Sequence, residues 1–278
     1  MKKESINQRV IHFRLSKKAI AIPMTFLMLF ASLFVVISVT YYFAVSKVNA
    51  NSQMLKISSA KQNMNSLEKT IDNILWKPGS SKNYEINDCG GKLIIEPNAN
   101  LLTINITDGT FNDVIFNYSI GRIIYQLPSS QSAETGLYLK GTSQVVENKS
   151  GAVMAQLFIE SGEEHPEIVL QYRPKVSYIA GGIVHDKPTN DVRIYIVNLN
   201  SSLDQELIGK IPVKMSCLSN EIFVTNYNLS YSPSNLHINV NLSDRTAQVS
   251  IPLLSNDNGA EIKIELVTCN TKIEKGIR

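Results

Sequence analysis

The sequence lacks the short motifs that identify most enzymes and nucleotide-binding proteins. It contains no CxxC pair, HExxH, GxSxG, P-loop or GxGxxG motif. Its four histidines are scattered, and only His165, within Ser161–Glu167, has several carboxylates beside it in the sequence. A charged hairpin loop explains that segment more simply than a metal site does. We therefore predict a non-enzymatic protein, with no catalytic residue, no cofactor and no metal.

Charged residues are absent from Ile20 to Val45, and Gly and Pro are absent from Met24 to Lys77. A helix over the uncharged run would be about 39 Å long, enough to cross a hydrocarbon core of about 30 Å. Residues 1–19 carry a net charge of +5, whereas the rest of the chain carries −2. The positive-inside rule places such a tail in the cytoplasm and the C-terminal part outside. Because the excess of basic residues is confined to the tail, we expect no nucleic-acid partner.

The N-terminal segments are expected to be a cytoplasmic basic tail or leader at 1–19, a transmembrane helix at 20–45 and a helical stalk at 46–78. Val48-Asn49-Ala50 resembles a signal-peptide cleavage site, which would remove the helix from the mature protein. However, the apolar run is much longer than the 7–15 residues typical of signal peptides. A retained signal anchor is therefore favoured over cleavage after Ala50.

The stalk carries apolar residues at alternating spacings of three and four, which is typical of one helix face. One interpretation is that this stripe packs on the protein's own external domain. The other is self-association of the stalk through Ile57, Met64, Leu67 and Ile71. About three heptads are present, too few to decide between the two.

From Lys92 onward, apolar residues alternate with polar ones. The clearest runs begin at Leu102, Val192, Leu236 and Ile262. Such runs predict half-buried strands, and turn signals such as Asp108-Gly109 separate them. The fold class expected is α+β: a long N-terminal transmembrane and stalk helix followed by an antiparallel β-sandwich-like domain at 79–278, with a subdivision near 198–209.

The three cysteines are Cys89, Cys217 and Cys269. A location outside the cytoplasm permits a disulfide. Cys217–Cys269 is the pair we favour, because Cys217 continues the apolar phase of a predicted strand and Cys269 ends the last one. The alternative is three buried thiols. Cys89 is expected to stay unpaired.

Six N-x-S/T sequons follow the apolar run, close to the number that chance gives in a chain this rich in Asn, Ser and Thr. They are candidate N-glycosylation sites in a host that glycosylates, and two of them fall on the polar phase of predicted strands. The six residues are Asn105, Asn117, Asn148, Asn200, Asn228 and Asn241.

The layout of the chain resembles that of archaeal type IV pilin-like proteins, which carry a class III signal peptide. The resemblance rests on the basic tail ending in Lys17-Lys18-Ala19, the unbroken apolar helix, its helical continuation and the β-rich head. It implies that a prepilin peptidase cuts between Ala19 and Ile20, so that Lys18, Ala19 and Ile20 form the processing site and the freed helices pack into a filament core. The chain departs from the family at Ala19, where Gly is commoner, and at Met24, where many pilins have Glu.

Two functions remain in view. The first is a pilin-like protein of the cell envelope, structural or adhesive, held in the cell membrane by a single pass with its head in the extracellular space. The second is a membrane-tethered module that binds a ligand or partner outside the cytoplasm. Expected partners are membrane lipid, other copies of the chain in a helix bundle or filament, or other envelope proteins.

Overall fold

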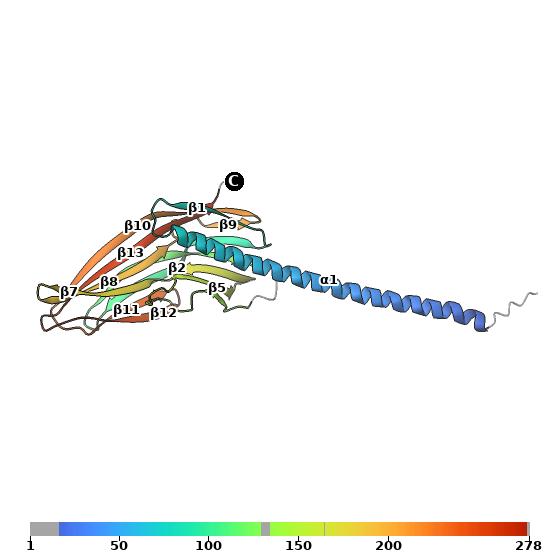
Figure 1. Cartoon of the computed structure of the whole chain (residues 1–278), viewed down its shortest axis with the longest axis horizontal. Coiled ribbons are helices and arrows are strands. Elements are labelled where there is room, and N and C mark those ends of the chain that lie inside the picture. Colours follow the sequence, from blue (N-terminus) through green and yellow to red (C-terminus); the bar gives the residue numbers. More distant parts are fainter. Residues whose placement is uncertain (1–16, 129–133, 164, 277–278) are drawn as a thin grey trace, which may run out of the picture. The chain divides into compact units, whose positions relative to one another are not determined.

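The computed structural model describes residues 17–128, 134–163 and 165–276, with side chains from residue 23 onward. Within these residues the chain forms one helix followed by a series of strands (Figure 1). Their bounds are α1 Lys17–Ile74, β1 Ser81–Ile86, β2 Lys92–Thr107, β3 Asn112–Gln126, β4 Tyr138–Lys140, β5 Ala155–Ser161, β6 Pro166–Tyr172, β7 Lys175–Val184, β8 Lys187–Asn198, β9 Gln205–Ile208, β10 Ile211–Leu229, β11 Asn235–Leu242, β12 Arg245–Pro252 and β13 Ala260–Lys275.

Helix α1 confirms the prediction of one long N-terminal helix. It is uninterrupted because no residue after Pro23 breaks its ladder of backbone hydrogen bonds. Every side chain from Pro23 to Lys56 is exposed, including the whole described part of the apolar run. Hydroxyls within the run, such as Ser38 and Thr40, donate to carbonyls one turn earlier. By length and composition, this helix could cross a membrane.

The chain divides into two compact units, Met1–Gln53 and Met54–Arg278, and α1 contributes to both. The second unit, called the head below, therefore begins inside the helix rather than at residue 79. No division falls at the expected subdivision near 198–209, where β9 pairs with β2.

The strands of the head form two curled sheets (Figure 1). One has the order β1-β10-β13-β8-β7, and the other has the order β12-β11-β2-β3-β6-β5-β4 with β9 paired to β2. Neighbours are antiparallel with one exception, because β13 and β8 run parallel, with Ile264 beside Val192. The expectation of a wholly antiparallel domain is wrong at that pair.

Two large buried clusters hold the head together. In one, side chains of both sheets meet, among them Ile104 of β2, Ile238 of β11 and Ile264 of β13. In the other, the helix stripe packs against residues of both sheets, including Leu170 and Ile273. The alternating strands predicted from the sequence thus each contribute one face to a core, as period-two patterning requires.

The stripe of the stalk lies inside this second cluster. Met64, Leu67 and Ile71 have no exposed surface, and Ile57 is only 6% exposed. The stripe therefore packs on the chain's own domain, as the first of the two interpretations predicted. Self-association through these four residues would need them at the surface, so it has no place in the folded head.

Candidate functional site

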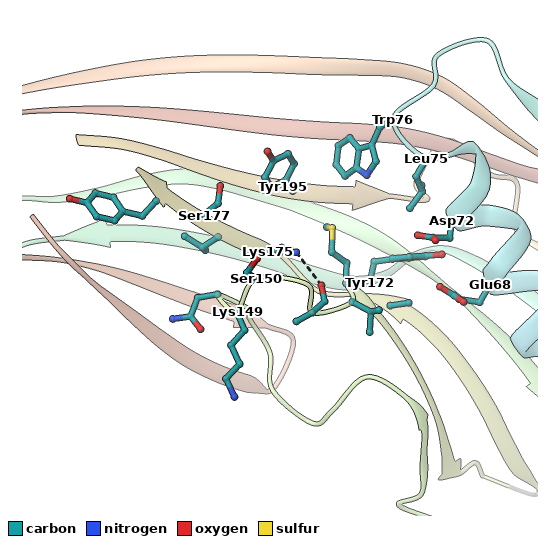
Figure 2. A pocket seen from close by; sticks show the side chains of 17 residues that line it. Glu68, Asp72, Leu75, Trp76, Lys149, Ser150, Tyr172, Lys175, Ser177 and Tyr195 are labelled. Carbon is teal, nitrogen blue, oxygen red and sulfur yellow. Dashed lines mark hydrogen bonds between the residues drawn. The ribbon is translucent and has the colours of Figure 1, made fainter. Parts of the chain in front are cut away.

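A cavity of about 620 Å³ lies within the head, where the last turns of α1 meet the loop before β5 and strands β6, β7 and β8 (Figure 2). Small-molecule sites in proteins commonly have volumes of 300–1,000 Å³. The helix supplies Glu68 and Asp72, followed by Trp76 just beyond its end, and the loop supplies residues between Asn148 and Met154. One of the sequon residues, Asn148, also lines this cavity, which is called the helix-end pocket below.

Two carboxylates mark the helix side of the pocket. Glu68 and Asp72 are four residues apart, so they lie on one face of the helix. Glu68 is 1% exposed and forms an ion pair with Lys140. Burial raises the pKa of Glu68 despite the opposing effect of Lys140. Asp72 is exposed, and no ion pair or hydrogen bond of its side chain is seen among the described residues. It therefore gives the helix end of the pocket one negative charge that no ion pair compensates.

The hydroxyl of Tyr172, at the end of β6, is buried and has no hydrogen-bond partner in the described part of the chain. Figure 2 shows this side chain extending toward Glu68 and Asp72. Burial raises the pKa of Tyr172 well above its ordinary value, and the charges of Glu68 and Asp72 raise it further. The phenol is therefore neutral. A buried polar group without a partner costs stability, so an orphaned hydroxyl directed at carboxylates needs an explanation.

Aromatic rings form another wall. The Trp76 ring meets the Tyr195 ring of β8 edge to face, with centroids 5.5 Å apart. Trp76 follows the end of the helix with φ of 64°, a left-handed conformation that glycine normally supplies after a helix. The Trp76 ring is half-buried. Tyr178 of β7 is fixed nearby by donating to the side-chain oxygen of Asn190, 3.0 Å away.

The loop wall is held by a buried ion pair. The Arg173 guanidinium lies 3.0 Å from the Glu147 carboxylate, with side chains 1% and 4% exposed. The same guanidinium donates to the Thr142 hydroxyl and to the carbonyls of Gln144 and Val153. These contacts fix residues 142–153 against the end of β6 and so give the pocket a defined wall.

Two lysines lie on this wall. Lys175 donates to the Ala152 carbonyl at 3.1 Å, as Figure 2 shows, whereas Lys149 is exposed. The pocket therefore has a carboxylate end on the helix and a basic end on the loop, with an apolar and aromatic section between them.

A second cavity, of about 660 Å³, lies between β3 and the β10–β13 pair. It also contains a buried hydroxyl without a partner in the described residues, that of Thr268. Both of its carboxylates are already used, because Tyr227 donates to Asp113 and Asn270 donates to Glu221. Unlike Asp72, neither of these carboxylates lacks a hydrogen-bond partner within the described chain, so the helix-end pocket is the stronger candidate.

The predicted cysteine pair comes together on the adjacent strands β10 and β13. The sulfurs of Cys217 and Cys269 are 3.5 Å apart, both are buried, and both are present as thiols. Burial, with Cys269 beside it, raises the pKa of Cys217 to about 11. Cys89 is buried elsewhere, accepts a hydrogen bond from Asn63, and has a pKa raised by burial. The disulfide remains a prediction.

The predicted glycosylation sites differ in accessibility. Asn105 is half-buried, with its side-chain oxygen buried and unpartnered in the described structure. The other five sequon residues, Asn117, Asn148, Asn200, Asn228 and Asn241, are exposed. Glycosylation of any of the six remains a prediction.

The remaining sequence predictions concern the processing site, the loop at His165 and metal binding. Lys18, Ala19 and Ile20 lie in the first turn of α1, but their side chains fall outside the described set, and their processing remains a prediction. Strands β5 and β6 form the expected hairpin around His165, although Glu164 lies outside the described residues. No group of side chains suited to a metal ion occurs among those described.

Sequence reasoning did not find the helix-end pocket, because its residues come from segments distant in the chain. Two features of the sequence could have indicated this pocket. One is the i, i+4 spacing of Glu68 and Asp72 beside the apolar stripe, and the other is the single tryptophan after the helix. Comparisons with family models, curated proteins and solved structures give no match.

Proposed function

We propose that this protein is a membrane-anchored, non-enzymatic, pilin-like protein of the cell envelope, with a structural or adhesive role. Its helix lies in the membrane and its β-rich head is presented outside the cytoplasm. A sandwich-like arrangement of the head is supported by the buried cluster to which both sheets contribute.

The observation that carries the proposal is the change in environment along one helix. From Pro23 to Val45 the apolar side chains are all exposed, whereas from Ile57 onward the apolar stripe is buried in the head. Phe26 and Tyr41, for example, are 73% and 71% exposed. A soluble protein rarely leaves so large an apolar surface in water, and a bilayer would cover it. The basic tail supports an orientation with the N-terminus in the cytoplasm.

The same contrast bears on self-assembly. Because the stripe from Ile57 to Ile74 is already packed within the head, contacts between copies of α1 would use its exposed N-terminal part. That arrangement suits a filament whose core contains the apolar helices and whose surface carries the heads. It equally suits a single anchor in the bilayer.

The test is the mature N-terminus, measured by mass spectrometry on native membranes, together with extraction at alkaline pH and protease treatment of intact cells. A start at Ile20 would support prepilin processing and filament assembly, and a start at Met1 would support a retained anchor. A start at Asn51, or a head protected from protease in intact cells, would refute the proposal. The matched variant is Ala19→Gly, which restores the residue commoner in pilins and should increase cleavage if a prepilin peptidase acts here.

A tethered binding module is the second candidate function, and the helix-end pocket favours it. The two functions share the anchor and differ in whether the head binds a ligand. Head-mediated adhesion or filament formation without any small-molecule binding would favour the first, and ligand binding without assembly would favour the second.

A further inference from the structure

We propose that the helix-end pocket binds a small organic cation, an amine with an apolar or aromatic body. The amine would lie against Asp72 and the Tyr172 hydroxyl, and its body would pack against Trp76 and Tyr195. This inference concerns the head alone and does not depend on the membrane anchor.

The sign of the ligand charge follows from the carboxylates. Glu68 is buried and paired with Lys140, so its charge is compensated inside the protein. Asp72 is exposed and has no partner in the described structure, which leaves one negative charge at this end of the pocket. A single ammonium group, with three N–H donors and one positive charge, matches that excess.

The Tyr172 hydroxyl supplies an independent indication of a ligand. It is 2% exposed, lines the pocket and lacks a hydrogen-bond partner in the described residues. A phenol oxygen can accept one N–H of an ammonium while its own hydrogen is donated to a carboxylate. Bound amine would therefore satisfy a group that the protein leaves unsatisfied, and Figure 2 shows the hydroxyl on the side of the pocket where Glu68 and Asp72 lie.

The aromatic wall suits the rest of such a ligand. Cations and aromatic bodies bind favourably to indole and phenol rings, and Trp is the strongest of these partners. Trp76 is held in a left-handed backbone conformation that places its ring against Tyr195. Leu75 and Met154 line the space beside these rings, providing apolar contact for a ligand body.

Competing ligands fit less well. A metal ion would need more acidic or histidine ligands than the described residues bring together. An anion would have to lie at the basic end, beside Lys175 and the exposed Lys149, and would leave the Tyr172 hydroxyl without a partner. The charge of the ligand is thus the feature that an experiment has to resolve.

The protein provides its own reporter, because Trp76 is the only tryptophan in the chain and lines the pocket. The full chain in detergent is titrated with three probes that share a ring and a short chain: phenethylamine, 2-phenylethanol and 3-phenylpropionate. Tryptophan fluorescence is excited at wavelengths where tyrosine does not absorb. Phenethylamine should give a saturable change, and the alcohol and the carboxylate should bind at least about tenfold more weakly. Equal binding of all three, preference for the carboxylate, or no response to the amine would overturn the proposal.

Two variants separate binding from folding. Asp72→Asn should weaken phenethylamine binding by about tenfold or more, since it removes the uncompensated charge. Tyr172→Phe should also weaken binding, yet leave the thermal unfolding midpoint equal or higher, because it deletes an unpaired buried hydroxyl. The matched control is Asp204→Asn, an exposed carboxylate outside the pocket, which should bind as the natural chain does. Unchanged affinity in both pocket variants, or equal weakening in the control, would refute the assignment.

Discussion

The buried pair of Arg173 and Glu147 gives the sharpest stability prediction. Replacing Arg173 with Met removes the guanidinium that lies 3.0 Å from the Glu147 carboxylate and leaves that carboxylate buried without its partner. The carbonyls of Gln144 and Val153 also lose a donor. Breaking a buried ion pair by removing one partner costs about 3–5 kcal/mol. Since whole domains are stable by about 5–15 kcal/mol, the head should lose a large part of its stability.

The assay is urea unfolding of the full chain in detergent, followed by tryptophan fluorescence, with the singles Arg173→Met and Glu147→Leu and the double variant. The double variant should be more stable than the sum of the single effects implies, because no unpaired charge remains buried. Arg193→Met serves as the control, since its ion pair with Glu265 is half-exposed and should contribute less than about 1 kcal/mol. A loss below about 1 kcal/mol for Arg173→Met, or strict additivity in the double variant, would refute the reasoning.

Three further predictions follow from the core. The predicted disulfide between Cys217 and Cys269 should leave one cysteine open to alkylation in denaturant without reductant, and three labels would exclude the bridge. Burial raises the pKa of Glu68 above 4.5, so the folded head binds that proton more tightly than the unfolded chain; stability should fall as pH rises from about 4.5 through the raised pKa. Glu68→Gln should remove that part of the pH dependence, and an unchanged profile of unfolding midpoints would contradict it. Leu67→Ala should cost about 2–5 kcal/mol, whereas Leu55→Ala, on an exposed face of the same helix, should cost almost nothing in urea unfolding; similar losses would contradict the packing of the stripe.

Local patterning predicted α1 and the four strands with the clearest alternation, β2, β8, β11 and β13. The absence of helix-breaking residues gave α1, and alternation at Leu102–Ile106 and Leu236–Leu242 gave two neighbouring strands whose apolar residues are fully buried or nearly so. These successes share a cause, because helix and strand periodicity follow from the direction of each side chain along a few consecutive residues.

Pairing between distant segments could not be predicted in this way. A period of two identifies the buried face of β8 and β13 but says nothing about which strand lies beside them or in which direction it runs. The stripe of α1 was compatible with two partners, and only the burial of Leu67 and Ile71 in the head distinguishes them.

The candidate site depended even more on tertiary structure. Asp72 and Tyr172 belong to a helix and to a strand far along the chain, and neither residue stands out in the sequence. The unpartnered hydroxyl of Tyr172 is visible only when every neighbouring donor and acceptor is in place. A site of this kind has no short motif, since its chemistry arises from packing rather than from spacing.

The buried stripe of α1 has a consequence for synthesis. Ribosomes make the helix first, yet its partners in the core include Cys269 and Ile273, close to the other end of the chain. The apolar stripe must therefore stay uncovered until nearly all strands have been made. Contacts between residues so distant in sequence form slowly, and apolar surface that is prone to aggregation stays exposed until they form. A chaperone would have its greatest effect on residues 57–74 during this interval.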